Sequence, residues 1–299
     1  MNHLNNIAVG VLGFIFLIAG TIQGQSIVDE DTRPQKITDG YQFTEGPVWH
    51  DSGYLLFSDI PANTVYKWAP GGQAEEFLNP SGHSNGLTFA ENGHLLLAQH
   101  DGAIGHLAEG GELVTVVDSY EGKRLNSPND LVVKSDGAIY FTDPDFGVSD
   151  EDKKLGMNGI YRYSEENGLT LLVEDFDLPN GIVFSPDEER LYVNDTRHNH
   201  IRVFDVKEDG TLANGKIFAE MKSNAEGAAD GMKVDSEGNL YSTGPGGLWI
   251  FSPEGEVLQQ VEMPERITNL AWGGSDFSTL FLTAPNAVYQ LETNQKGER

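Results

Sequence analysis

The stretch NDLVVKSDGAIYFTD, residues 129–143, contains the unit that decides the fold. It begins with a polar residue, continues as an apolar segment, turns at a Gly-bearing sequence and ends in a second apolar segment. Such a unit predicts two β-strands joined by a tight turn. Five related copies occur in the chain: EGPVWHDSGYLLFSD from residue 45, NGLTFAENGHLLLAQ from residue 85, NGIVFSPDEERLYVND from residue 180, DGMKVDSEGNLYSTG from residue 230 and NLAWGGSDFSTLFLTA from residue 269.

The leading residues of the six copies are separated by 40, 44, 51, 50 and 39 positions. This spacing is typical of four-stranded propeller blades, which take roughly 40–50 residues each. Further apolar runs between the copies, such as VYKW, GIYRY, IRVFDV and GLWIFS, supply the remaining strands. A β-solenoid is the alternative, but a repeat of this length is too long for one of its coils. The sequence therefore predicts an all-β fold, a six-bladed β-propeller.

The last copy is followed by too little chain for a complete blade. Residues 269–299 provide only about three strands, and an incomplete blade would leave an unpaired sheet edge. The segment Gln35–Asp39, which precedes the first copy, is expected to supply the missing strand. Residues 25–299 are thus predicted to form a single propeller domain that is closed by an N-terminal strand.

An apolar run, Ile7–Ala19, lies near the start of the chain and resembles a secretory signal peptide. An uncleaved membrane anchor is the alternative, but the run is shorter than the ~20 residues that span a bilayer. We therefore expect residues 1–24 to be a signal peptide, cleaved near Gly24, and the mature chain to have no membrane span. This predicts a periplasmic or extracellular protein.

The composition narrows the choice of partners and chemistry. The 46 acidic and 19 basic residues give a formal net charge of −27, and such a surface repels nucleic acid. The chain has no cysteine, which excludes disulfides, thiolate metal sites and cysteine nucleophiles. A small molecule is the expected partner, and the oligomeric state is left open.

The leading residue of every copy offers a side-chain oxygen. Taken singly, an Asn-Gly or Asp-Gly pair is more often only a turn, but a turn does not require such a residue in one register six times. If the strand that follows lines the central channel, all six side chains converge at one mouth. Converging oxygens suit a hard cation, Ca²⁺ first and then Mg²⁺ or Mn²⁺. The six residues are Glu45, Asn85, Asn129, Asn180, Asp230 and Asn269.

Four longer runs carry a resemblance to a known family. They are TEGPVW, KRLNSPNDLVVKSDGAIYFTDP, LPNGIVFSPDEERLYVNDT and ADGMKVDSEGNLY. In this order they resemble the gluconolactonase and senescence-marker-protein family, over roughly Gln42 to Ala284. The resemblance implies a six-bladed propeller and a divalent-metal-dependent lactonase that acts on a sugar lactone. Diisopropyl fluorophosphatases are more distant relatives on the same scaffold.

The resemblance also implies roles for particular residues. It makes Glu45, Asn129, Asn180 and Asp230 metal ligands, and Asp230 also the proton acceptor or nucleophile. The metal is expected to be Ca²⁺, with Mg²⁺, Mn²⁺ or Zn²⁺ as alternatives. Asn85 and Asn269, the other two leading residues, are expected to contact the substrate or a metal-bound water.

Two further residues are candidates for substrate binding. His100 ends a strand of the second copy, where the family often has a His, although it could simply cap that strand. Animal members carry an Arg where this chain has Ser127, and Arg124 is the candidate replacement. Asp143 and Asp195 end corresponding strands. We interpret them either as partners of Asn129 and Asn180 or, preferably, as sheet-corner residues.

The histidines of the run RHNH are expected at the surface.

Two other functions remain open at this stage. One is a hydrolase on the same scaffold that acts on other lactones or on phosphotriesters. The other is a non-catalytic propeller that binds a ligand, although a binder has no reason to keep a complete ligand set.

Overall fold

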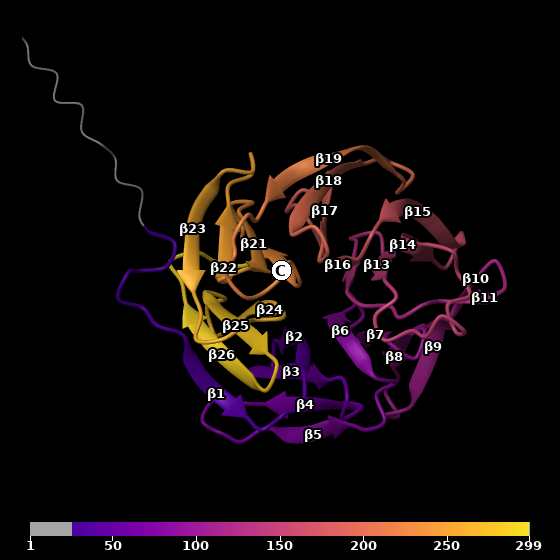
Figure 1. Cartoon of the computed structure of the whole chain (residues 1–299). Helices are drawn as coiled ribbons and strands as arrows, with labels where there is room; N and C mark the ends of the chain where they lie inside the picture. The colour runs from indigo at the N-terminus through magenta and orange to yellow at the C-terminus, as the bar shows by residue number, and fades with distance from the viewer. Residues whose placement is uncertain (1–25, 299) are drawn as a thin grey trace, which may run out of the picture.

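The computed structural model of this protein describes residues 26–298, and every regular element within them is a β-strand. Six antiparallel sheets of four strands each stand in a ring around a central axis (Figure 1). The six-bladed β-propeller that the repeats predict is therefore confirmed. No helix within residues 26–298 is long and apolar enough to cross a membrane.

Each of the first five blades is built from four consecutive strands, with the innermost strand first. Blade one holds β2 (Thr44–His50), β3 (Tyr54–Asp59), β4 (Thr64–Trp68) and β5 (Glu75–Leu78), and blade two holds β6 (Ser84–Phe89), β7 (Leu95–Gln99), β8 (Ala103–Leu107) and β9 (Leu113–Val117). Blade three holds β12 (Leu131–Val133), β13 (Ile139–Asp143), β14 (Asn158–Ser164) and β15 (Gly168–Phe176), and blade four holds β16 (Pro179–Phe184), β17 (Arg190–Asp195), β18 (His200–Val206) and β19 (Leu212–Glu220). Blade five holds β20 (Met232–Val234), β21 (Leu240–Gly244), β22 (Gly247–Phe251) and β23 (Val257–Glu262).

The sixth blade joins the two ends of the described chain. It contains β24 (Leu270–Gly273), β25 (Thr279–Ala284) and β26 (Ala287–Glu292), and its outermost strand is β1 (Gln35–Asp39). β1 runs antiparallel to β26, with Gln35 opposite Gln290 and Asp39 opposite Ala287. The N-terminal strand thus completes the ring. The predicted signal peptide, residues 1–24, lies outside the described residues.

The segment that precedes β1 adds a second tie. Val28 is buried, and its backbone N–H donates to Oε1 of Gln259 on β23 while the Gln259 Nε2 donates to the Val28 carbonyl. Ile27 and Val28 belong to an apolar cluster that includes Leu248 of blade five and Leu280 of blade six. The N-terminal segment therefore connects these two blades as well as closing the ring.

Period-two alternation builds the core, because successive side chains of a strand face opposite neighbouring blades. On β3, Leu55 packs in a cluster with Phe281 of blade six, whereas Leu56 packs with Leu97 of blade two. Full burial of one such side chain is worth roughly 1.5–3 kcal/mol.

A short hairpin stands outside the blades. It consists of β10 (Ser119–Tyr120) and β11 (Lys123–Arg124), and it lies between blades two and three. Figure 1 shows this hairpin at the outer edge of the ring, and Arg124 belongs to its second strand.

Candidate active site

The innermost strands pack so closely at one mouth of the channel that glycine is required there. A Cβ on Gly46 would lie 1.9 Å from the carbonyl oxygen of Asn85, and one on Gly181 would lie 2.2 Å from that of Asp230. The Gly181 N–H donates to this Asp230 carbonyl at 3.1 Å. The glycine after a leading residue thus permits contact between blades and is not simply a turn signal.

This close packing brings the six leading residues together at one mouth, where all are at least 96% buried. We call them the oxygen ring: Glu45, Asn85, Asn129, Asn180, Asp230 and Asn269. Asn85 Nδ2 donates to Asn129 Oδ1 at 2.7 Å, and Asn129 Nδ2 donates to Asn180 Oδ1 at 2.5 Å. Three amides therefore form a chain across blades two, three and four.

On the other side of the oxygen ring, an amide holds a carboxylate. Asn269 Nδ2 donates to Oε2 of Glu45 at 3.1 Å, and the Gly46 N–H donates to the same oxygen at 2.9 Å. The Asn269 Oδ1 in turn accepts the Leu270 N–H at 2.8 Å. Both polar ends of the Asn269 side chain are thus bonded within the protein, and its contact is with Glu45.

The two acids of the oxygen ring occupy a site that disfavours negative charge. Burial raises the pKa of Glu45 well above its usual range, and the charge of Asp230 raises it further. Burial also raises the pKa of Asp230 to about 7, although the Arg266 guanidinium acts in the opposite direction. Two buried carboxylates this close are costly without positive charge, and a cation would remove the cost.

The donor set fits a hard divalent cation. It contains two carboxylates and four amides, and Asn85 Oδ1 is buried with no hydrogen-bond partner among residues 26–298. No group of three or more His, Cys, Asp or Glu side chains in this part of the chain is arranged to hold a metal. Amide and carboxylate oxygens favour Ca²⁺ or Mg²⁺, whereas zinc sites rely on His and Cys. The residues present therefore suit Ca²⁺ better than Zn²⁺.

Three aspartates determine where the oxygen ring residues lie. Each stands at the end of the second strand of its blade and accepts backbone N–H groups three and two positions before a ring residue. Asp59 accepts from Gln42 and Phe43, Asp143 from Asn126 and Ser127, and Asp195 from Asp177 and Leu178. Asp143 and Asp195 thus contact backbone at the sheet corners and do not bond to the amides of Asn129 and Asn180.

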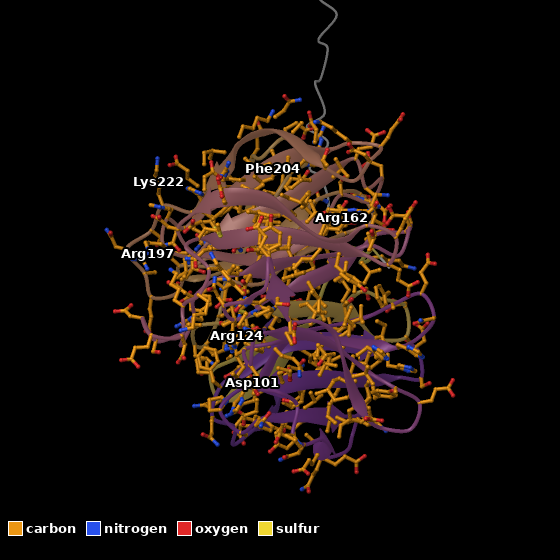
Figure 2. The ribbon with its side chains drawn as sticks, turned by 90° about the vertical axis from the view of Figure 1, so that its right-hand side faces the viewer. Asp101, Arg124, Arg162, Arg197, Phe204 and Lys222 are labelled. Atoms are coloured by element: carbon orange, nitrogen blue, oxygen red, sulfur yellow. The ribbon has the colours of Figure 1, made fainter. Side chains whose placement is uncertain are left out.

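A cavity of about 510 Å³ is lined by both predicted substrate-binding residues outside the ring, His100 and Arg124. His100 Nε2 lies 3.3 Å from Asn85 Nδ2, and burial lowers the pKa of His100 to about 4, so this imidazole is neutral at pH 7. Figure 2 shows Arg124 and Asp101, which both line the cavity, on the same side of the molecule.

Arg124 is exposed but held in place by backbone carbonyls. Its Nη1 donates to the carbonyls of Leu125 and Asn126 at 2.7 and 2.6 Å, and Nη2 lies 3.3 Å from that of His100. Residues Phe146–Val148 and Asp152, from the loop between β13 and β14, also line the cavity.

Sequence reasoning missed two residues that contact side chains of the ring: Thr196, whose Oγ1 accepts from Asn180 Nδ2 at 3.0 Å, and Arg266. Arg266 comes from the segment between β23 and β24, and its Nη2 lies 3.4 Å from Oδ2 of Asp230. No motif marks it, because 36 positions separate it from Asp230. The only signal for Arg266 in the sequence is a basic residue three positions before Asn269, the last leading residue.

The predicted pair His198 and His200 lies away from the oxygen ring. His198 bonds to Asp177 at 2.6 Å and is about half exposed, and its ring stacks on that of His200. This is the surface position expected from the sequence.

The fold and the site together define a class: six-bladed propellers in which every innermost strand delivers one oxygen-bearing side chain to a single mouth of the channel. Residues 43–286 match the family described as SMP-30/Gluconolactonase/LRE-like region, and the chain belongs to this family. The family resemblance drawn from the four sequence runs is confirmed.

Individual relatives agree with this assignment. A gluconolactonase from Zymomonas mobilis is 34% identical over 91% of this chain and 84% of its own length. A pentonolactonase from Haloferax volcanii is 27% identical over 80% of each chain. Among solved structures, a gluconolactonase from Xanthomonas campestris superposes with a TM-score of 0.81 and 31% identity, and the match covers 90% of this chain and 91% of that one.

Proposed function

We propose that this protein hydrolyses the ester bond of a sugar lactone with the help of a divalent metal ion. Membership of the family, and similarity to both a gluconolactonase and a pentonolactonase, support lactone hydrolysis. The single observation that carries the proposal is the convergence of two buried carboxylates, Glu45 and Asp230, with four amides at one mouth of the channel. His100, which contacts one of these amides, lines the neighbouring cavity. The neutral His100 and the Arg124 guanidinium in that cavity suit a polyhydroxylated substrate.

In this proposal Glu45, Asn129, Asn180 and Asp230 hold the metal, and we expect Ca²⁺ first. When bound there, a divalent cation supplies polarisation of the lactone carbonyl and stabilises the developing negative charge. Asn269 orients Glu45 through its Nδ2, and the amide chain that starts at Asn85 keeps the ligand oxygens in register.

Asp230 is the proposed catalytic residue. It either removes a proton from the attacking water or attacks the carbonyl carbon itself, forming a mixed anhydride that water then hydrolyses. In both routes the ring C–O bond breaks, the ring oxygen leaves as a hydroxyl and a hydroxy acid results. We expect His100, Arg124 and Asn85 to bind the hydroxyl groups of the sugar.

The test is a substrate panel on purified protein that has been stripped with chelator and reloaded with Ca²⁺, Mg²⁺, Mn²⁺ or Zn²⁺. We expect hydrolysis of D-glucono-1,5-lactone or a pentonolactone, loss of this activity on chelation and its return with Ca²⁺. Hydrolysis of a phosphotriester alone would overturn the choice of substrate. Full activity after complete removal of metal would overturn the proposed metal dependence.

We also propose that the protein is exported, on the basis of the apolar run Ile7–Ala19. Fractionation of cells that express the full chain tests this. Mature protein outside the cytoplasm, beginning near residue 25, is the expected result, and full-length protein in the cytoplasm would contradict it.

A further inference from the structure

The side chain of Arg266 lies between the interior of the oxygen ring and solvent. This side chain is 35% exposed, whereas the side chain of Asp230, which it contacts, is 6% exposed. Its guanidinium carbon lies 5.9 Å from the centre of the Phe43 ring, just before β2 of blade one. Phe43 therefore supports one face of the guanidinium while Nη2 is directed at Oδ2 of Asp230, 3.4 Å away.

One hydrogen-bond donor of Arg266 is left without a partner. Its Nε is buried and has no hydrogen-bond partner among residues 26–298. A buried donor without a partner is costly, so an arginine that served only to stabilise the fold would be expected to satisfy it. Arg266 is also the only Arg or Lys in the described part of the chain that forms an ion pair with a member of the oxygen ring.

We propose that Arg266 is a positioning residue for Asp230: it holds Oδ2, so that the other carboxylate oxygen points to the reacting atoms. This inference rests on the proposed lactonase function, since it assigns a partner to the catalytic carboxylate. It also places one permanent positive charge beside the buried Asp230.

The proposal predicts that removing the Arg266 guanidinium lowers kcat but raises the affinity for Ca²⁺. Removing the guanidinium frees Asp230 to rotate, so kcat falls while KM changes little, because Arg266 does not line the cavity that contains His100 and Arg124. Removing a positive charge beside the ring reduces repulsion of an incoming cation, so the affinity for Ca²⁺ rises. If Arg266 served only to stabilise the fold, its removal would lower kcat and the Ca²⁺ affinity together.

The experiment compares Arg266→Gln and Arg266→Lys with a matched control, Arg202→Gln. Arg202 also pairs with an aspartate, Asp175, at 2.7 Å and stacks on a phenylalanine, Phe176, but it lies on β18 away from the ring. Calorimetric titration of chelator-stripped protein with CaCl₂ gives the metal affinity without any substrate. Steady-state kinetics on the lactone found for the wild type gives kcat and KM, and thermal melts report folding.

For Arg266→Gln we expect kcat to fall roughly 10- to 100-fold, the range for losing one hydrogen bond to a charged group. Its Ca²⁺ affinity should rise by roughly threefold or more. Arg266→Lys should recover part of kcat, and Arg202→Gln should keep both values of the wild type. Wild-type kcat in Arg266→Gln, or a weaker affinity for Ca²⁺, overturns the inference. If the wild type hydrolyses no lactone, the proposed function fails, while the titration still tests the placement of Arg266.

Discussion

Asn85 donates a hydrogen bond from Nδ2 to Oδ1 of Asn129, 2.7 Å away, and so links blade two to blade three at the mouth of the channel. Asn129 Nδ2 in turn donates a hydrogen bond to Oδ1 of Asn180 on blade four. Because each amide bonds to the next, the directions of the Asn129 and Asn180 oxygens depend on their neighbours. The middle member, Asn129, has the largest influence on the set.

Replacing Asn129 with alanine should therefore weaken metal binding more than the loss of one ligand implies. It removes one oxygen and also breaks the bonds that link the side chain at this position to Asn85 Nδ2 and to Asn180 Oδ1. We expect Ca²⁺ affinity to fall by about tenfold or more, which corresponds to ~1.4 kcal/mol. Calorimetric titration checks this, with Asn167→Ala, at an exposed turn, as the control. Equal affinities for the two variants would show that the amide chain does not organise the site.

Asp230→Asn keeps the shape of the side chain but removes its charge and its ability to accept a proton. If Asp230 is the base or nucleophile, kcat should fall by ~10² to 10⁴. Metal affinity should fall too, because one carboxylate is lost, so kinetics must be measured at saturating Ca²⁺. Recovery of most activity at saturating metal would mean that Asp230 is only a ligand and that another group moves the proton.

Stabilisation by metal should increase with pH. The pKa of Asp230 is raised from 3.8 to about 7 by burial, and that of Glu45 is raised in the same direction. Between about pH 4 and about pH 7 the unfolded chain is ionised while the folded, metal-free protein keeps its proton on Asp230, so the metal-free fold loses stability across this range and the loss is complete above about pH 7. A bound cation favours the ionised form and removes this loss.

Thermal melts with and without Ca²⁺ measure the effect. The rise in Tm on adding Ca²⁺ should be larger at about pH 8 than at about pH 5.5, since protons compete with metal at the lower pH. In Asp230→Asn, the calcium-induced rise in Tm should differ less between these two pH values. A calcium-induced shift that is independent of pH would contradict the assignment of these acids as ligands.

Deleting the N-terminal segment should open the propeller. A chain that begins at Tyr41 lacks β1, which leaves β26 with an unpaired edge, and lacks Val28, whose backbone bonds to Gln259. We expect a marked fall in Tm together with aggregation through the exposed edge. A chain that begins at Ser26 is the control and should melt like the longer protein. If both truncations melt alike, ring closure by β1 contributes nothing to stability.

The sequence was sufficient for the architecture and for the register of the oxygen ring. Strand alternation, turns and repeat spacing are local patterns, so they predicted six blades. Pairing of every sheet edge then required a closing strand, and the segment Gln35–Asp39 was available for it. The same register identified one oxygen-bearing residue per blade, from Glu45 to Asn269, before any contact was known.

Only the tertiary structure decided how these residues act on one another. Asp230 lies in the connection from blade four to blade five, and Arg266 lies in the connection from blade five to blade six. They meet because ring closure brings these separate loops to one mouth of the channel. The amide chain from Asn85 and the contact of Asn269 with Glu45 likewise depend on the spacing between blades. Side-chain hydrogen bonds are short and directional, so they follow from the three-dimensional arrangement of the blades, which a linear pattern of residues does not specify.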